Sequence, residues 1–188
     1  MSNKYKLLES YVLLEKFASG GMADIYLAKK NNTEIQKFVS IKKVLHPYVS
    51  HNDFNKLFKE EIRVSIGLHH SNIVSYLDYV VVKEQVFLVM EYINGVNLRQ
   101  FLNDLGIFKK KLEVPFALHL ASQIAAGLDY VHKKTDDVTG TALNIIHRDI
   151  NPTNLMISFD GEVKVIDFGI ARSNQKLDKT KSGMIVGK

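Results

Sequence analysis

The sequence predicts an α+β protein in two parts, the first built on an antiparallel sheet and the second mostly helical. Five short runs rich in alternating or β-branched residues lie between residues 11 and 92, with one helical pattern among them. After a break at Asn94-Gly95, the most regular pattern is a long amphipathic helix that starts near Pro115. The chain has 188 residues, 46% of them hydrophobic, which is enough for a buried core.

The first part begins with three predicted strands and a helix. Residues 11–17 partly alternate, Ser19-Gly20-Gly21-Met22 interrupts the pattern, and residues 25–28 resume it, which is typical of a hairpin with a glycine-containing tip. Residues 38–42 predict a third strand. Residues 53–68 have apolar side chains at helical spacing. These are Phe54, Leu57, Phe58, Ile62 and Ile66.

Two further strands, residues 73–82 and 85–92, complete a predicted five-stranded antiparallel sheet with one helix. The simplest layout is two lobes joined near residues 92–95. In the second part, Leu120, Ile124, Leu128 and Val131 share one face of the helix that begins at Pro115. Beyond a polar, turn-rich stretch, residues 155–158 and 163–166 flank Asp160-Gly161, a strong hairpin signal.

Composition excludes several classes of protein. The absence of cysteine excludes disulfides and thiolate metal sites and favours a reducing compartment. No signal peptide and no unbroken apolar span is visible, so we expect a cytoplasmic protein with no membrane segment in this chain. The net charge of +5 suits a nucleotide site or an ordinary basic protein, and the scattered basic residues argue against nucleic acid as a partner.

The strongest functional signal is His147-Arg148-Asp149-Ile150-Asn151-Pro152-Thr153-Asn154, followed by Asp167-Phe168-Gly169. These segments resemble the catalytic loop and the metal-binding turn of the protein kinase family. The resemblance makes Asp149 the acceptor of a hydroxyl proton, and Asn154 and Asp167 the ligands of Mg²⁺ on the phosphates of ATP. Each tripeptide alone could occur by accident, but together they bracket a predicted hairpin in the required order.

The resemblance covers essentially the whole chain and implies the two-lobe protein kinase fold. Residues 1–93 would form the N-lobe, and residues 94–188 an incomplete, mostly helical C-lobe. In the N-lobe, Val39-Ser40-Ile41-Lys42 matches the strand whose lysine binds the α and β phosphates. Counting back from His70-Ser71-Asn72-Ile73-Val74 selects Glu61, and not Glu60, as the partner of Lys42.

The loop that covers the nucleotide is the weakest match, because it keeps only the middle glycine of the family's glycine pattern. Glycine lets backbone approach phosphates closely and adopt positive φ, so the alanines here predict altered nucleotide contact. Gly21 supplies some of the missing freedom. The residues expected to cover the nucleotide are Ala18, Ser19, Gly20, Gly21, Met22 and Ala23.

An adenine site is implied by residues 88–93, which resemble the family's strand and hinge. Met90 would lie at the back of the pocket, and Glu91 and Ile93 would offer backbone donors and acceptors; the same residues could equally be a buried strand end. The positions expected to sandwich the adenine ring by apolar contact are Ile25, Ser40 and Met156. His147 is interpreted as an organiser of the backbone and not as a base.

One departure concerns the position two residues after Asp149, where serine/threonine kinases usually carry lysine and this chain has Asn151. Losing one preorganised donor costs on the order of 10²- to 10³-fold in rate. Asn151 is nevertheless counted among the catalytic residues, with Asp149, Lys42 and Glu61. Pro152-Thr153-Asn154 favours serine/threonine over tyrosine specificity.

Arg148 implies regulation by phosphorylation, because in such kinases the arginine pairs with a phosphate on the following loop. Thr180, Ser182 and Ser173 are the candidate sites, although all three could be solvated hydroxyls, the interpretation favoured for Ser173. The end of the chain resembles the late activation loop of bacterial signalling kinases. The helices that follow in the family are expected to be missing, which would leave apolar surface of the helix at residues 115–132 uncovered.

Two functions remain open on the sequence. The first is an ATP- and Mg²⁺-dependent kinase acting on serine and threonine hydroxyls of proteins. The second is a non-catalytic, truncated kinase-like module that binds nucleotide or serves as a scaffold, with another kinase or a second copy as its partner. Asn151, the alanines of the loop and the missing helices favour this second function somewhat, and a small-molecule kinase is a distant third.

Overall fold

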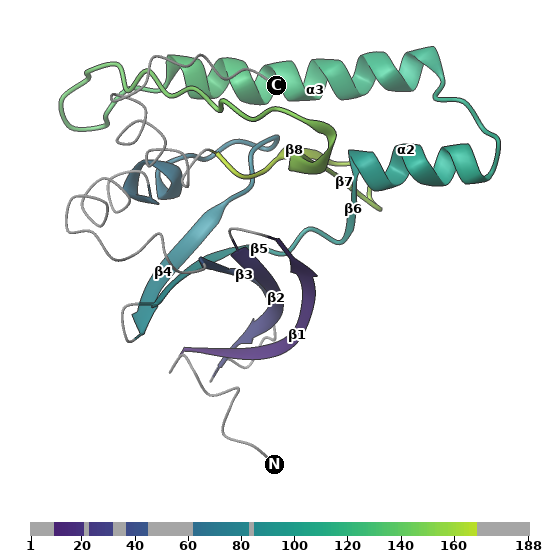
Figure 1. Ribbon diagram of the computed structural model, residues 1–188. Coiled ribbons are helices and arrows are strands. Elements are labelled where there is room, and N and C mark those ends of the chain that lie inside the picture. The colour runs from purple at the N-terminus through teal and green to yellow at the C-terminus, as the bar shows by residue number, and fades with distance from the viewer. Residues whose placement is uncertain (1–9, 21–22, 32–36, 45–61, 83–84, 169–188) are drawn as a thin grey trace, which may run out of the picture. The chain divides into compact units, whose positions relative to one another are not determined.

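The computed structural model describes residues 10–20, 23–31, 37–44, 62–82 and 85–168. The described residues fall into two compact units (Figure 1). The first unit takes the described residues up to Ile66, together with Tyr76–Met90. The second unit takes Gly67–Ser75 and Glu91–Phe168. The chain therefore leaves the first unit after Ile66, returns to it at Tyr76 and leaves it again after Met90.

A five-stranded sheet forms the first unit, as predicted, in the order β1-β2-β3-β5-β4. The pairs β1/β2, β2/β3 and β4/β5 are antiparallel. Register shifts bulge β1 at two places, which is how a long strand bends (Figure 1). The strands are β1 (Tyr11–Ser19), β2 (Ala23–Lys30), β3 (Phe38–Val44), β4 (Tyr76–Val82) and β5 (Gln85–Glu91).

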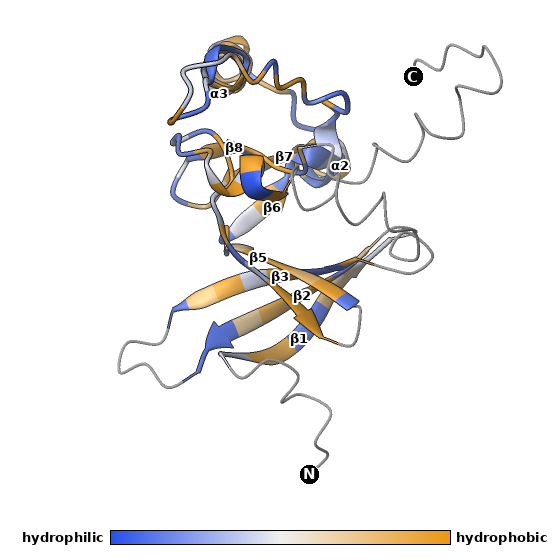
Figure 2. Cartoon of the chain, turned by 90° about the vertical axis from the view of Figure 1, so that its left-hand side faces the viewer, coloured by the Kyte–Doolittle hydropathy of each residue, from blue (hydrophilic) through white to orange (hydrophobic). Residues whose placement is uncertain are grey.

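One face of this sheet carries the apolar core of the first unit. Period-2 alternation places every second side chain on the same face, and the buried members come from four of the five strands. Figure 2 shows the apolar stretches of these strands in orange. The buried cluster consists of Tyr11, Leu13, Ala28, Val39, Ile41, Phe87 and Val89.

The predicted start of the fourth strand was wrong. β4 begins at Tyr76 and not at residue 73. Ile73 instead forms a parallel bridge with Val165 and is fully buried in the second unit, where it packs with Val131. β-branched residues predict extended backbone, but they do not say which sheet that backbone joins. Of the helix predicted at residues 53–68, residues 62–66 are helical, and residues 53–61 lie outside the described part.

The second unit contains two elements that the sequence did not predict. β6 (Gly95–Asn97) pairs with β7, and α2 (Leu98–Ile107) follows at once. Asn97 caps α2, because its side-chain oxygen accepts the backbone N–H of Gln100 at 2.9 Å. Gly95 does not merely break the chain. A Cβ at this residue would lie 2.0 Å from the carbonyl oxygen of Ile157, so only glycine lets the two strands pair.

The predicted long helix is α3 (Val114–Lys133), which starts with proline in its first turn. Leu120 and Val131 are buried, and Ile124 packs against both core clusters of the unit. Gly127 meets the segment before β4, because a Cβ there would lie 3.0 Å from the carbonyl oxygen of Asn72. The predicted apolar face is therefore confirmed.

The predicted hairpin at Asp160-Gly161 is also present. β7 (Leu155–Ser158) and β8 (Val163–Val165) pair antiparallel, and Gly161 takes a φ of +89° in the turn. A short 3₁₀ helix, η2 (Pro152–Asn154), immediately precedes β7. Antiparallel pairing brings the beginning of one strand to the end of the other, so the residues just before β7 lie beside the residues just after β8.

Candidate active site

His147 organises the segment in which the sequence predicts the catalytic aspartate. The imidazole is 2% exposed. Its Nδ1 accepts the backbone N–H of Asp149 at 3.2 Å, so the proton is on Nε2, which donates to the carbonyl oxygen of Ile166 at 2.8 Å. The Phe168 ring lies 4.6 Å from the imidazole, tilted by 60°. His147 thus connects the segment before β7 to the segment after β8, as its predicted role requires.

Two residues of these segments have backbone angles that side chains rarely adopt. Arg148 has φ +64° and Asp167 has φ +59°. Non-glycine residues in the left-handed region cost free energy and persist where surrounding bonds hold them, which is common at functional sites. The neighbours of Arg148 are His147 and Asp149. The His147 ring accepts the backbone N–H of Asp149, and this hydrogen bond across Arg148 provides such a restraint.

Asp149 is half-buried and is held through its own backbone. Its carbonyl oxygen accepts Nδ2 of Asn154 at 2.9 Å and Nδ2 of Asn151 at 3.1 Å. The Asn154 amide also approaches Oδ2 of the Asp149 carboxylate at 3.4 Å. Three side chains, including His147, therefore fix the orientation of Asp149. A carboxylate fixed in this way suits proton abstraction, because general bases act from a defined position.

Asn151, which replaces the lysine of the family pattern, has a local structural task that the sequence reasoning missed. Its Oδ1 accepts the backbone N–H of Thr153 at 2.9 Å, so Asn151 caps η2. The signal was available, since asparagine before proline often starts a turn or a helix. The predicted catalytic role of Asn151 stays a prediction.

Asn154 and Asp167 are the two predicted metal ligands, and the β7/β8 pairing brings the backbone of Asn154 beside the residue before Asp167. The backbone N–H of Ile166 donates to the carbonyl oxygen of Asn154 at 2.9 Å, and Asp167 follows directly. Because Nδ2 of Asn154 is used by Asp149, its Oδ1 is the side-chain atom that remains for a cation. One carboxylate and one amide oxygen fit Mg²⁺, which in phosphate-transfer sites takes few protein ligands and completes its shell with phosphate and water.

The β1–β2 tip of the first unit, residues 18–23, is held by exposed side chains. Ser19 Oγ donates to Asp24 at 2.6 Å, and Lys16 lies 3.5 Å from the same carboxylate oxygen. The Ser19 hydrogen bond lowers the pKa of Asp24, helped by Lys16. Gly20 donates its N–H to the carbonyl oxygen of Ala23 at 2.9 Å. Gly21 and Met22, also predicted to cover the nucleotide, lie outside the described residues.

Three of the predicted nucleotide-binding residues share one face of the sheet. Ile25 is the register partner of Lys42, and Leu27 is the partner of Ser40. In an antiparallel sheet, register partners and residues two apart on one strand have their side chains on the same face. Ile25, Ser40 and Lys42 therefore share the face opposite that of the core residues Val39 and Ile41. Lys42 is half-buried there. Its predicted partner Glu61 lies outside the described residues, as do Thr180, Ser182 and Ser173.

The remaining predicted positions are at strand ends. Met90, the last described residue of the first unit, is 6% exposed and pairs with Tyr76. Ala18 lies opposite Ile25 in the β1/β2 pair. Met156 is half-buried on β7, and Ile93 is half-buried after β5. The nucleotide contacts predicted for these residues stay predictions.

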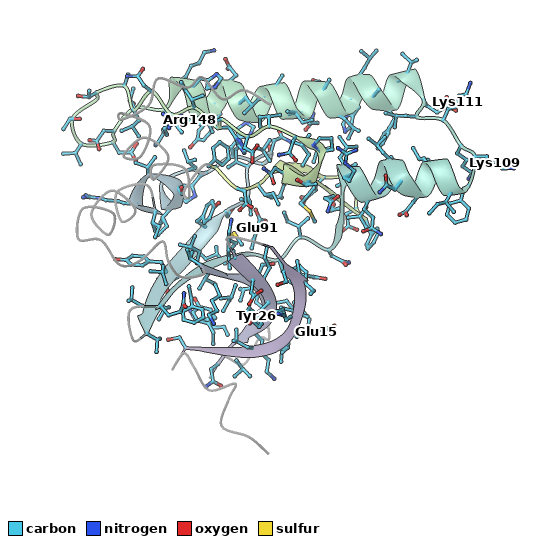
Figure 3. The ribbon with its side chains drawn as sticks, viewed as in Figure 1. Glu15, Tyr26, Glu91, Lys109, Lys111 and Arg148 are labelled. Atoms are coloured by element: carbon cyan, nitrogen blue, oxygen red, sulfur yellow. The ribbon has the colours of Figure 1, made fainter. Side chains whose placement is uncertain are left out.

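Glu91 makes an interaction that the sequence did not predict. Figure 3 labels Glu91. Its carboxylate forms an ion pair with Lys164 of β8, with 3.1 Å between Oε1 and Nζ. The available signal was a lysine in the centre of the apolar strand Val163-Lys164-Val165. A buried cation in such a strand requires a partner, but the sequence does not say which of its acidic residues that partner is.

Comparison with known proteins identifies relatives along almost the whole chain. The protein kinase domain family matches residues 11–186. The tyrosine-protein kinase MasK of Myxococcus xanthus is 36% identical over 179 residues, which are 95% of this chain and 28% of MasK. The serine/threonine-protein kinase PrkC of Bacillus subtilis is 31% identical over 177 residues, 94% of this chain and 25% of PrkC. The chain thus spans less than a third of either relative.

Solved structures agree on the fold. The PknI kinase domain of Mycobacterium tuberculosis superposes with a TM-score of 0.70 at 24% identity, covering 86% of this chain and 60% of that domain. A double mutant of the same domain gives a TM-score of 0.73, covering 91% of this chain and 63% of that one. The catalytic segment, the fold and the family match all agree, and the chain belongs to the protein kinase family.

Proposed function

We propose that this chain is the nucleotide-binding and catalytic part of a protein kinase that transfers the γ-phosphoryl group of ATP to serine and threonine hydroxyls of proteins. The observation that supports this best is the restraint of Asp149 by His147, Asn151 and Asn154, with Asn154 bonded to the residue before Asp167. The nucleotide-binding part extends to residue 93, and the catalytic part begins at residue 94.

Each residue has a defined role in this proposal. The Asp149 carboxylate accepts the proton of the substrate hydroxyl as that oxygen attacks phosphorus. Asn154 Oδ1 and the Asp167 carboxylate hold Mg²⁺, which neutralises charge on the phosphates. Lys42, paired with Glu61, binds the phosphates, and the β1–β2 tip covers them. Residues 91 and 93 bind adenine through their backbone.

The hydroxyl specificity is part of the proposal, because the two relatives named above differ in it. PrkC is named a serine/threonine kinase and MasK a tyrosine kinase. The segment Pro152-Thr153-Asn154 favours serine and threonine, as in the family pattern. The proposal also includes protein substrates, a second kinase as a partner, and a cytoplasmic location. Within the described part of the chain, no helix combines the length and the apolar character needed to span a bilayer.

A phosphotransfer assay tests the proposal. The protein is incubated with Mg²⁺, γ-labelled ATP and a serine- and threonine-containing protein, and the labelled amino acids are identified after hydrolysis. We expect phosphoserine and phosphothreonine, and Asp149→Asn to lower kcat by about 10²- to 10⁴-fold. The control is Asp129→Asn, since Asp129 is an exposed aspartate of the same unit that pairs only with Lys133 among the described ion pairs.

Each outcome has a clear meaning. Labelled tyrosine with unlabelled serine and threonine would contradict the specificity. Nucleotide binding with no transfer, unaffected by Asp149→Asn, would favour the non-catalytic scaffold. An equal loss of kcat in Asp149→Asn and Asp129→Asn would contradict the role assigned to Asp149.

A further inference from the structure

Lys164 is a buried cation at the centre of β8. The residue is 7% exposed, between Val163 and Val165, which are both buried. An ammonium group in such surroundings is costly unless it is paired and hydrogen-bonded. Its partner is Glu91, at the end of β5, and the side chains of the pair are 9% and 24% exposed. Bulk water therefore screens this pair far less than the exposed ion pairs of the chain.

The Glu91 carboxylate also takes part in the backbone ladder. The N–H of Glu91 donates to the carbonyl oxygen of Ser75 at 3.0 Å, as expected for an antiparallel pair. The return bond is different, because the N–H of Ser75 donates to the side-chain Oε1 of Glu91 at 2.7 Å. The side chain thus takes the place that the backbone carbonyl of Glu91 would fill in a regular ladder.

Residues 72–75 lie between Glu91 and the strand of Lys164. On the β8 side, Asn72 Nδ2 donates to the carbonyl oxygen of Val163 at 2.9 Å, and the N–H of Val165 donates to the carbonyl oxygen of Asn72 at 2.8 Å. These bonds flank Lys164 on both sides. The Lys164–Glu91 pair therefore spans this segment and joins β8 to the end of β5.

We propose that Lys164 is a positioning residue for nucleotide binding. It holds the Glu91 carboxylate on Ser75, which keeps the Glu91 carbonyl out of the ladder and available to adenine. Lys164 also lies three residues before Asp167, so one cation connects the adenine-binding backbone to the strand that leads to the metal ligand. This inference rests on the proposed function, in which residues 91 and 93 bind adenine.

Replacement of Lys164 by methionine should loosen the adenine-binding backbone. Methionine keeps an unbranched apolar side chain but removes the charge, so the half-buried carboxylate of Glu91 turns to water and leaves Ser75. The Ser75 N–H then takes the Glu91 carbonyl as its acceptor. We expect the KM for ATP and the Kd for Mg·ADP to rise about 10- to 100-fold, because small misplacements of binding groups have effects of this size. The kcat should change much less, since Asp149 keeps its own restraints.

The experiment compares Lys164→Met, Lys164→Arg and Lys134→Met in the intact protein, by Mg·ADP titration and by kcat and KM for ATP. Lys164→Arg keeps the charge and should restore most of the affinity. Lys134→Met is the matched control, since it breaks the 2.7 Å pair with the exposed Asp137 elsewhere in the unit. Unchanged Kd and KM in Lys164→Met, or a loss confined to kcat, would overturn the positioning role.

Two further results make the test decisive. If Lys164→Met does not fold, Glu91→Gln replaces it, because glutamine keeps an acceptor for Ser75 and loses only the charge. A rise in Kd smaller than that expected for Lys164→Met supports the inference. An unchanged Kd overturns it. If the wild-type protein binds no Mg·ADP, the proposed function fails and the inference with it. Wild-type binding with no effect of either variant contradicts the inference alone.

Discussion

The catalytic segment of the second unit (residues 147–154) and the β1–β2 tip of the first unit (residues 18–23) are held in different ways. The catalytic segment is fixed by a buried imidazole and by amide side chains bonded to backbone. The tip is held by an exposed hydroxyl and an exposed lysine on one carboxylate. Buried polar bonds are costly to lose, while exposed ones are exchanged for water. The catalytic segment should therefore tolerate substitution less well than the tip.

The largest expected effect comes from removing the His147 imidazole. His147→Ala leaves a cavity beside Phe168 and removes the partner of two backbone groups, at Asp149 and Ile166. We expect the free energy of unfolding to fall by about 3–5 kcal/mol, measured by urea titration. His119, exposed on α3, is the control, and His119→Ala should change stability by less than about 0.5 kcal/mol. Equal effects of the two variants would show that the bonds of His147 contribute no more to stability than an exposed histidine does.

A glycine-to-alanine substitution should cost far more in β6 of the second unit than at the tip of the first. Gly95→Ala places a Cβ 2.0 Å from the Ile157 carbonyl oxygen, so β6 must move off β7. We expect a loss of about 2–3 kcal/mol in stability, by analogy with overpacked cores. Gly20→Ala places its Cβ 3.8 Å from the nearest atom, an ordinary contact, and should change stability by less than about 0.5 kcal/mol. Thermal unfolding of the two variants measures the difference, and a costly Gly20→Ala would show that the tip is less tolerant than its contacts indicate.

A smaller effect is expected at Asn151. Asn151→Ala removes the cap of η2 and should cost about 0.5–2 kcal/mol. Asn151→Asp keeps an acceptor for the Thr153 N–H but loses the Nδ2 donor to the Asp149 carbonyl oxygen, so it should recover only part of that loss. Chemical denaturation of both variants tests the capping role, and equal stability of the two would contradict it. Transfer rates of the same variants show separately whether Asn151 has the predicted catalytic role.

The smallest effect concerns the titration of Asp24. Ser19→Ala removes the main cause of its lowered pKa, so this pKa should rise toward the ordinary aspartate value, and Lys16→Met should raise it less. Since the pKa is lowered in the folded state, the stabilisation is present above the unfolded pKa and is lost as pH falls through the folded one. NMR titration of the carboxyl carbon measures the shift. An unchanged pKa in Ser19→Ala would contradict the hydrogen bond as its cause.

Much of the fold could be predicted because local patterns are strong in this chain. The hairpin at Asp160-Gly161 depends on turn chemistry, and α3 depends on a helical stripe started by Pro115. α2 was missed although its signals were present, since Asn97 is a good cap and Leu98, Phe101, Leu102 and Leu105 recur at helical spacing. β6 was missed because three residues are too few to show alternation.

The candidate site was predicted unevenly for a related reason. Asp149, Asn154 and Asp167 belong to compact motifs whose spacing is visible in the chain, and the structure brings the residues around them together through the β7/β8 pairing. Lys164 and Glu91 are 73 positions apart, and nothing local connects them. The cap formed by Asn151 was overlooked because the family pattern directed attention to its missing charge.

By itself, the sequence determined most of the strands, the long helix and the order of the catalytic motifs, because these depend on side-chain period, turn residues and local spacing. Only the tertiary structure decided that Ile73 and Val74 bond to β8 and do not belong to β4, and that Lys164 meets Glu91. Such choices depend on which distant surfaces exclude water together and which charges are then left to pair. That balance is set by the whole packed unit, and no local window of sequence contains it.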